Sequence, residues 1–152
     1  MLFRSVDPGP LVADIPAAVL DPVLARCDWW SCNQREATLL TGSDDPAEAA
    51  RRLVRQTAQA DVIVRAASDG CVVAMRVPGP GAGHGLSLSH IAAPAVDAVD
   101  TTGAGDAFVA GFLAARLTGA DILIALGRAT AEGAAASTIV GGQPRPPIAA
   151  RD

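Results

Sequence analysis

Seven consecutive residues, Asp100–Asp106 (DTTGAGD), combine the residue types that the transfer of a charged group would need. Gly103 and Gly105 permit a tight turn that leaves several backbone N–H groups pointing the same way. An amphipathic segment follows at once, so these donors stand at a helix N-terminus, where the helix dipole favours negative charge. The segment predicts an anion hole built from the N–H groups of Gly103, Ala104 and Gly105. The carboxylate of Asp106 would then be placed to act on a nucleophile beside a phosphoryl group.

The same segment has a plainer interpretation, which the residues alone leave open. Glycine-rich turns between a strand and a helix are common, and an Asp near a helix start often interacts only with the helix dipole. A bare GxGD pattern is therefore a weak signal, whereas the complete string of seven residues is much more specific.

Asn33–Glu36 (NQRE) forms a second polar pattern at a predicted helix start. An Asn followed three positions later by a Glu has the spacing of a capping box, in which each side chain accepts from the other residue's backbone N–H. A capping box alone would explain this spacing.

The elements that must position these residues alternate along the chain. Hydrophobic spacing and turn residues predict strands and helices at the following places. The strands are Met1–Val6, Cys27–Ser31, Asp61–Ala66, Cys71–Val77, Leu86–Ile91 and the strand-like Val96–Val99; the helices are Ile15–Ala25, a short one from Asn33 to about Thr41, one from Asp44 or Asp45 to about Gln59, Ala104–Leu117 and Asp121–Ile139. The alternation predicts one α/β domain over residues 1–152, with a largely parallel sheet flanked by helices.

Composition and charge exclude several classes of function. Lys and Arg number 12 and Asp and Glu 16, for a net charge of -4, and no basic block stands out, so we expect no nucleic-acid partner. No segment approaches the roughly 18 apolar residues that span a bilayer, so we expect no membrane partner. Cys27, Cys32 and Cys71 form no CxxC pair and have no His at metal-ligand spacing, which predicts buried, reduced thiols in a cytoplasmic protein.

Two familiar nucleotide-binding patterns are absent from the sequence. The chain contains no Lys, so it has no GxxxxGK[ST] phosphate-binding loop, and no GxGxxG follows a predicted strand. His84 lies in a glycine-rich loop and His90 on a predicted strand, so we expect both to be surface residues rather than catalysts.

The complete DTTGAGD string resembles the signature of the ribokinase-like sugar kinases, also called the phosphofructokinase-B family. The resemblance covers the C-terminal half of that family, and Met1–Pro10 resembles its mid-chain strand. It implies a partial ribokinase-like fold that carries the ATP-binding and catalytic residues. The substrate-binding and lid half would be absent.

The resemblance implies transfer of the γ-phosphoryl group of ATP to a hydroxyl of a sugar or a similar alcohol. Asp106 would accept the hydroxyl proton, and the N–H groups of residues 103–105 would stabilise the transferred charge. In the family the Asn-x-x-Glu pair organises Mg²⁺ and the phosphates, largely through water. Asn33 and Glu36 are therefore the expected magnesium residues, and Asn33 is also an expected nucleotide contact.

Further nucleotide contacts follow from the same resemblance. Residues 62–70 resemble the strand and turn that flank the nucleotide, which makes Ser68 and Gly70 expected ATP contacts. Ala67 stands where the family usually has Gly. Thr130 occupies the position of a usual Asn, in a helix that resembles the one beside the adenine.

Many relatives also bind a monovalent cation, K⁺, beside the anion hole. Asp100 and Thr102 match positions that contribute there, the first by its side chain and backbone and the second by its carbonyl oxygen. The later ligands, toward Ser137 and Gly141, align only loosely.

Two hypotheses of different classes follow from the sequence. In the first, the chain is one half of a kinase for a sugar or sugar-like small molecule, and its chemistry needs the other half. In the second, it is a non-catalytic nucleotide-binding or oligomerisation module derived from such a kinase. An apolar strand edge would be exposed in either case, so we expect a homo-oligomer or association with the missing half.

Overall fold

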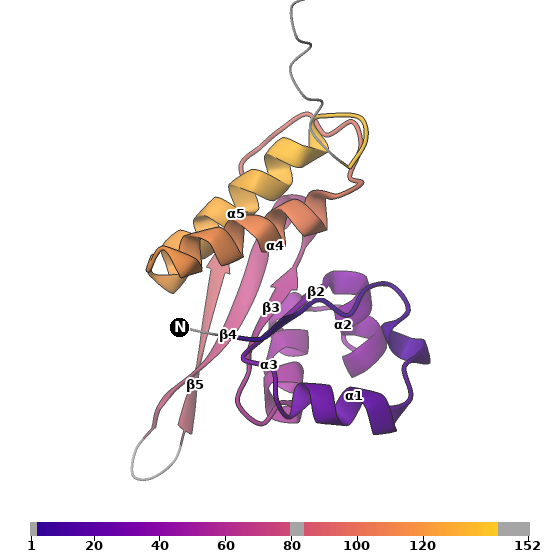
Figure 1. Cartoon of the computed structure of the whole chain (residues 1–152), viewed down its shortest axis with the longest axis vertical. Coiled ribbons are helices and arrows are strands. Elements are labelled where there is room, and N and C mark those ends of the chain that lie inside the picture. Colours follow the sequence, from indigo (N-terminus) through magenta and orange to yellow (C-terminus); the bar gives the residue numbers. More distant parts are fainter. Residues whose placement is uncertain (1–2, 80–83, 143–152) are drawn as a thin grey trace, which may run out of the picture. The chain divides into compact units, whose positions relative to one another are not determined.

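The computed structural model of the chain describes residues 3–79 and 84–142 (Figure 1). Contacts within the chain divide it into two compact units, Met1–Ala93 and Pro94–Asp152, which we call unit 1 and unit 2. Each unit is described by itself below. The single domain expected over residues 1–152 stays a prediction.

Unit 1 is built on a five-stranded sheet with the strand order β1-β2-β3-β4-β5. The strands are β1 (Ser5–Val6), β2 (Trp29–Asn33), β3 (Asp61–Arg65), β4 (Cys71–Pro78) and β5 (His84–Ile91). The first three run parallel to one another, and β3, β4 and β5 pair antiparallel in sequence order. The expected α/β architecture is confirmed, and the strands expected at Cys71–Val77 and Leu86–Ile91 form the antiparallel hairpin of β4 and β5.

Three helices of unit 1 supply the crossovers between the parallel strands. Helix α1 (Ala17–Leu24) joins β1 to β2 after the short 3-10 turn η1 (Val12–Asp14), while α2 (Gln34–Thr41) and α3 (Pro46–Gln56) join β2 to β3. Helix α3 begins where the Asp45 side chain accepts from the N–H of Ala47, with Pro46 in its first turn. Both residue types are favoured at those positions of a helix start.

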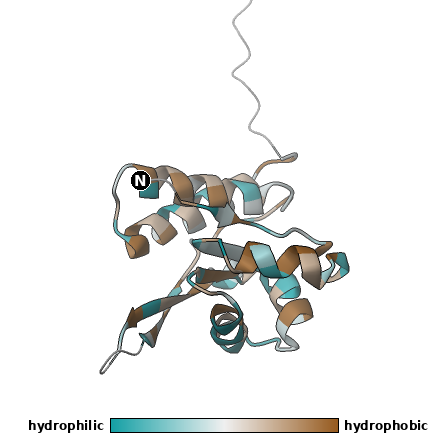
Figure 2. Ribbon diagram, turned by 60° about the horizontal axis from the view of Figure 1, so that its bottom comes forward, coloured by the Kyte–Doolittle hydropathy of each residue, from teal (hydrophilic) through white to brown (hydrophobic). Residues whose placement is uncertain are grey.

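The core of unit 1 lies between these helices and one face of the sheet. Its members share near-complete burial: they include Trp30, Cys32, Val62, Val64 and Ala74 from the sheet and Ala49, Ala50, Leu53 and Val54 from α3. The strand residues recur at every second position, because alternate side chains of a strand point to the same face. Figure 2 shows hydrophobic and hydrophilic stretches alternating along the helical ribbons, as expected for helices that bury one face.

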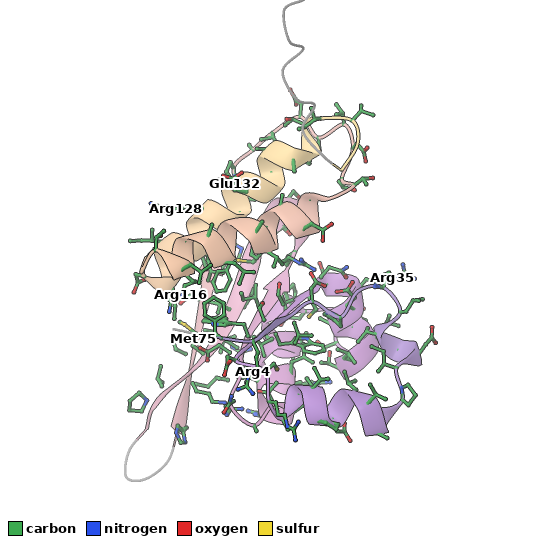
Figure 3. The ribbon with its side chains drawn as sticks, in the orientation of Figure 1. Arg4, Arg35, Met75, Arg116, Arg128 and Glu132 are labelled. Carbon is green, nitrogen blue, oxygen red and sulfur yellow. The ribbon has the colours of Figure 1, made fainter. Side chains whose placement is uncertain are left out.

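Unit 2 is a pair of adjacent helices, α4 (Ala104–Leu117) and α5 (Ile122–Ser137). Two glycines allow their close approach. A Cβ atom added at Gly111 would lie 2.8 Å from Cγ of Glu132, which Figure 3 labels on α5. A Cβ atom at Gly133 would lie 3.1 Å from the carbonyl oxygen of Ala104. The helices therefore pack at distances that a larger residue at either glycine would disturb.

Several predicted boundaries differ from the observed ones. The strand predicted at Val96–Val99 is wrong: the segment is irregular, and the N–H of Val99 donates to the carbonyl oxygen of Ser137 (2.9 Å), at the end of α5, rather than to a strand. Helix α3 ends at Gln56 instead of Gln59 because Thr57 turns the chain, its hydroxyl donating to the carbonyl of Val54. The strand expected over Cys27–Ser31 is β2, which begins and ends two residues later.

Other predictions are confirmed within the described part of the chain. The three cysteines are free and buried, and burial raises the pKa values of Cys32 and Cys71 to about 12, so their thiols stay protonated. His84 and His90 are exposed, although His84 begins β5 rather than lying in a loop. Residues 80–83 of the glycine-rich loop expected before Leu86 lie outside the described residues. So do residues 143–152, where three prolines predict an irregular tail. No helix in residues 3–79 or 84–142 has the length and apolar character to cross a bilayer.

We predict that Gly111→Ala lowers the free energy of unfolding of the chain. The added methyl group overpacks the helix contact by about 1–3 kcal/mol, against about 1 kcal/mol gained in helix propensity. Gly127→Ala is the matched control, because a Cβ atom at Gly127 meets nothing within 4 Å and should be neutral or stabilising. Urea unfolding measures the free energy of unfolding of both variants. Equal changes in this free energy would contradict a close helix contact at Gly111.

Candidate functional site

Three neighbouring strands of unit 1 end in polar residues at the same edge of the sheet. Asp7 follows β1, Asn33 is the last residue of β2, and Arg65 is the last residue of β3. Asn33 and Arg65 lie directly opposite each other in the parallel register of β2 and β3. Ligands of open parallel sheets bind at the carboxyl ends of strands, which makes this edge a candidate binding site.

The predicted capping box at the start of α2 is present. Oδ1 of Asn33 accepts from the N–H of Glu36 (2.9 Å), and Oε2 of Glu36 accepts from the N–H of Asn33 (2.9 Å). A third bond joins the two side chains, with Nδ2 of Asn33 donating to Oε1 of Glu36 (2.7 Å). Glu36 is only 3% exposed, so its carboxylate has a fixed orientation. The pair is therefore a rigid polar group at the carboxyl end of β2.

This polar pair fits an indirect role in magnesium binding. Within residues 3–79 and 84–142, no three His, Cys, Asp or Glu side chains gather as a metal site. Each oxygen of Glu36 already accepts a hydrogen bond from Asn33, yet a carboxylate can accept about four such bonds. Mg²⁺ keeps several of its waters and is bound through few protein groups, so a buried carboxylate that accepts from those waters suits it.

The turn after β3 places the two other predicted nucleotide contacts of unit 1. Ser68 is exposed within the 3-10 turn η2 (Ala67–Asp69). Gly70 has a φ of +90°, and a Cβ atom there would lie 2.0 Å from the carbonyl oxygen of Ile91, so β5 leaves room only for glycine. The packing against Ile91 explains Gly70 without a ligand, and both nucleotide contacts stay predictions.

The segment Asp100–Asp106 of unit 2 is held by the first of its carboxylates. Oδ1 of Asp100 accepts from the N–H of Thr102 (2.9 Å), and Oδ2 accepts from the N–H of Gly141 (2.8 Å). The backbone N–H of Asp100 donates to the carbonyl of Ser137 (3.1 Å). The bonds from Gly141 and Thr102 hold the pKa of Asp100 below its usual range, because they stabilise the ionised form.

Asp100 thus ties the segment before α4 to the segment after α5. Both carboxylate oxygens accept backbone N–H groups, an arrangement that a structural staple explains on its own. The monovalent cation expected at Asp100 and Thr102 stays a prediction.

The glycine turn that follows brings the chain into α4. Gly103 is the N-cap of α4 with a φ of +77°, and a Cβ atom there would lie 2.8 Å from the carbonyl oxygen of Gly142. Asp106 is exposed in the first turn of the helix. The N–H of Ala104 donates to the carbonyl of Thr101 (3.1 Å), which closes the turn. An anion at the predicted hole would have to compete with this bond for Ala104.

Thr130, the predicted adenine neighbour, lies on α5. Its side chain is buried, and its hydroxyl donates to the carbonyl of Gly127 one turn earlier in the helix (2.9 Å). The hydroxyl can then only accept a further hydrogen bond. Its nucleotide contact stays a prediction.

Sequence reasoning missed Arg65 and Asp7 as site residues. Nη1 of Arg65 lies 2.7 Å from Oδ2 of Asp7, and Nη2 lies 3.9 Å from Oε2 of Glu36. The available signal was the charged residue immediately after the apolar run Val62–Val64, at the end of a predicted parallel strand. Its partner Asp7 could not be found from the sequence pattern, because the pairing depends on the order of the strands in the sheet.

Residues 7–149 match the pfkB family carbohydrate kinase domain. The chain belongs to this family. Fructokinase from Klebsiella pneumoniae is 38% identical over 95 residues, which make up 62% of this chain and 28% of that protein. Ribokinase from Mus musculus is 40% identical over 110 residues, 68% of this chain and 30% of that protein.

The fold agrees with the family assignment. The solved structure of Arabidopsis thaliana ribokinase complexed with ribose and ATP has a TM-score of 0.72 and 26% identity, over 90% of this chain and 42% of that one. This pfkB family chain has the ribokinase-like fold. It spans less than a third of the length of the two enzymes named above.

We predict that Ala67→Gly stabilises the turn at the candidate site. Ala67 has a φ of +50°, the only positive φ of a non-glycine residue in the described chain. The left-handed conformation costs an L-residue roughly 1–2 kcal/mol, and glycine loses about 0.5–1 kcal/mol in chain entropy, so the free energy of unfolding should rise by up to about 1.5 kcal/mol. Ala25→Gly is the control: Ala25 has a φ of −70°, which an L-residue adopts without strain, so glycine there should lower the free energy of unfolding. A lower free energy of unfolding in both variants would contradict the strain at Ala67.

We predict that Asp100→Ala loosens the segment before α4. Amide hydrogen exchange at Thr102 and Gly141 should become several-fold faster because both N–H groups lose their acceptor. Asp97→Ala removes a nearby exposed carboxylate that holds no hydrogen bond among the described residues, and it should leave both rates unchanged. Unchanged exchange in Asp100→Ala would show that the carboxylate does not hold the segment.

Proposed function

We propose that this chain supplies the ATP-binding and catalytic residues for phosphoryl transfer from ATP to a hydroxyl of a sugar or sugar-like alcohol. The observation that carries the proposal is the exposed carboxylate of Asp106 in the first turn of α4, directly after a glycine turn that Asp100 holds in place. Membership of the pfkB carbohydrate kinase family supports the same reaction.

Each residue of the segment has a physical task in this reaction. Asp106 accepts the proton of the attacking hydroxyl, and its exposure leaves it accessible to a substrate. The N–H groups at Gly103–Gly105 and the dipole of α4 stabilise negative charge on the transferred group. Phosphoryl transfer depends mainly on positioning and electrostatics, so the rigidity of this segment is itself part of the mechanism.

The residues of unit 1 would hold the nucleotide and its magnesium. Asn33 and Glu36 would accept from the hydration shell of Mg²⁺, and Ser68 and Gly70 would lie along the nucleotide. The ion, when bound, would neutralise negative charge on the phosphates. Thr130 beside the adenine and K⁺ at Asp100 and Thr102 belong to the same proposal.

The acceptor is proposed from the names of the relatives. They are a fructokinase and a ribokinase, so a small sugar is the expected acceptor class. Because the chain covers only 28% and 30% of those two proteins, we propose that sugar phosphorylation needs residues beyond these 152, from a longer polypeptide or a partner chain. A cytoplasmic location is part of the same proposal.

The first test is ADP formation from Mg·ATP with ribose or fructose, alongside calorimetric binding of Mg·ADP. Binding with turnover on one sugar would support the kinase. Binding without turnover is expected of the 152 residues alone under either candidate. If turnover stays absent when the longer polypeptide or the partner chain is supplied, a nucleotide-binding module that lacks catalysis is favoured. Absence of binding by the folded chain would contradict both.

We predict that Asp106→Ala, in the form of the protein that shows turnover, lowers kcat by about 10²–10⁴-fold because the general base is lost. Nucleotide affinity should change little, since this carboxylate acts on the acceptor hydroxyl. Asp97→Ala is the control for loss of an exposed carboxylate in the same unit. Undiminished turnover in Asp106→Ala would show that Asp106 is not the general base.

A further inference from the structure

Arg65 connects the two carboxylates at the carboxyl edge of the sheet in unit 1. Its guanidinium lies 2.7 Å from Asp7 through Nη1 and 3.9 Å from Glu36 through Nη2. The side chains of Arg65 and Glu36 are 11% and 4% exposed, so water screens their interaction little. Asp7 is 30% exposed and holds one end of the guanidinium from the solvent side.

The planar guanidinium suits this position because its nitrogens can face two carboxylates at once. A lysine ammonium is a point charge and would favour one partner over the other. Asp7, placed after β1, and Glu36, in the first turn of α2, approach Arg65 from different elements. Arg65 therefore fixes the separation of these two carboxylates as well as neutralising one charge.

A second Arg–Asp ion pair in the same unit differs from the Arg65 pair in its exposure and its place on the sheet. Arg4 and Asp28 precede β1 and β2 and pair at 3.2 Å, at the amino ends of the strands. The Arg4 side chain is 59% exposed. Among the described residues it forms no hydrogen bond or ion pair with Asn33 or Glu36. Figure 3 labels Arg4 there and Arg35 at the start of α2, at the other end of the sheet. Exposed ion pairs of this kind contribute little to the stability of the fold. Removing one member of a buried pair, in contrast, leaves an uncompensated charge in the interior.

We propose that Arg65, held by Asp7, is a positioning residue that keeps the Glu36 carboxylate oriented to receive the hydration shell of a divalent cation. The proposal rests on the function proposed above. Without Arg65, the buried carboxylate of Glu36 would face only uncharged donors from Asn33, and it would relax toward solvent. The two hydrogen bonds that its oxygens accept from Asn33 would then have to hold it without the ion pair.

The charges at this edge suit a nucleotide that arrives with its metal ion. Asp7, Glu36 and Arg65 together carry one net negative charge. Through charge alone, loss of Arg65 would strengthen the attraction for a divalent cation and the repulsion of a polyphosphate, and so would raise the magnesium dependence of nucleotide binding. A fall in that dependence therefore reports the orientation of Glu36 and not the net charge.

The test measures how much Mg²⁺ strengthens nucleotide binding. Calorimetry gives the dissociation constant of ADP in EDTA and in Mg²⁺, and the ratio of the two is the magnesium dependence. Arg65→Met should lower this ratio at least fivefold, and Arg65→Lys should lower it less because an ammonium can still face Glu36. Arg4→Met, the same substitution in the exposed pair of the same sheet, should leave the ratio unchanged.

A purely structural role for Arg65 would give a different result. It would lower the melting temperature of the metal-free chain but leave the ratio unchanged. It would also act independently of Glu36. We expect instead that Arg65→Met causes no further loss in a Glu36→Gln background, because both changes remove the same oriented carboxylate.

Two outcomes would overturn the proposal. One is an unchanged ratio in folded Arg65→Met; the other is fully additive losses with Glu36→Gln. If Arg65→Met fails to fold, Asp7→Asn replaces it, since this variant leaves Arg65 and Glu36 in place, and an unchanged ratio there overturns the proposal equally. Failure of the unaltered chain to bind ADP would instead contradict the proposed function, which keeps the two failures distinct.

Discussion

The reciprocal hydrogen bonds between Asn33 and Glu36 are the interaction on which the candidate site of unit 1 depends. Asn33 ends β2, and α2 begins at the next residue, so these bonds join the middle parallel strand to the helix that follows it. They also satisfy orphan N–H groups of the helix start. The same bonds hold an almost fully buried carboxylate in one orientation. A structural requirement and a chemical one are thereby met by the same two side chains.

The segment Asp100–Asp106 of unit 2 depends on a long-range closure within that unit. Asp100 accepts N–H groups from both sides, one within its own turn and one from Gly141 after α5. Gly103 then comes so close to Gly142 that no side chain would fit at Gly103. The start of α4 is therefore held by the end of α5, and the close helix contact keeps these two ends aligned. Asp106 owes its position to this closure.

The turn at residues 67–70 shows how packing and chemistry compete for the same backbone. Gly70 is required by the nearby carbonyl of Ile91, and Ala67 adopts a left-handed conformation that glycine would adopt with less strain. Strained turns are often found at functional sites. In this chain the strain lies beside Arg65, at the edge where the polar residues of three strands meet.

Local patterns in the sequence determined the capping box, the helix Ala104–Leu117 and the glycine turn before it. Each of these depends on residues within a few positions of one another, whose spacing alone dictates which groups can bond. The predicted strand at Val96–Val99 shows the limit of such patterns, because its N–H group found a partner at the end of α5 instead of in a sheet.

Only the tertiary structure decided the partners that are distant in the chain. The Asp7–Arg65 pair exists because β1, β2 and β3 run parallel and end at the same edge. The bond from Gly141 to Asp100 exists because α5 returns alongside α4. A sequence pattern reports the neighbours of a residue along the chain, whereas strand order and helix packing choose its neighbours in space. Those choices come from burying apolar faces over the whole fold, which no short segment encodes.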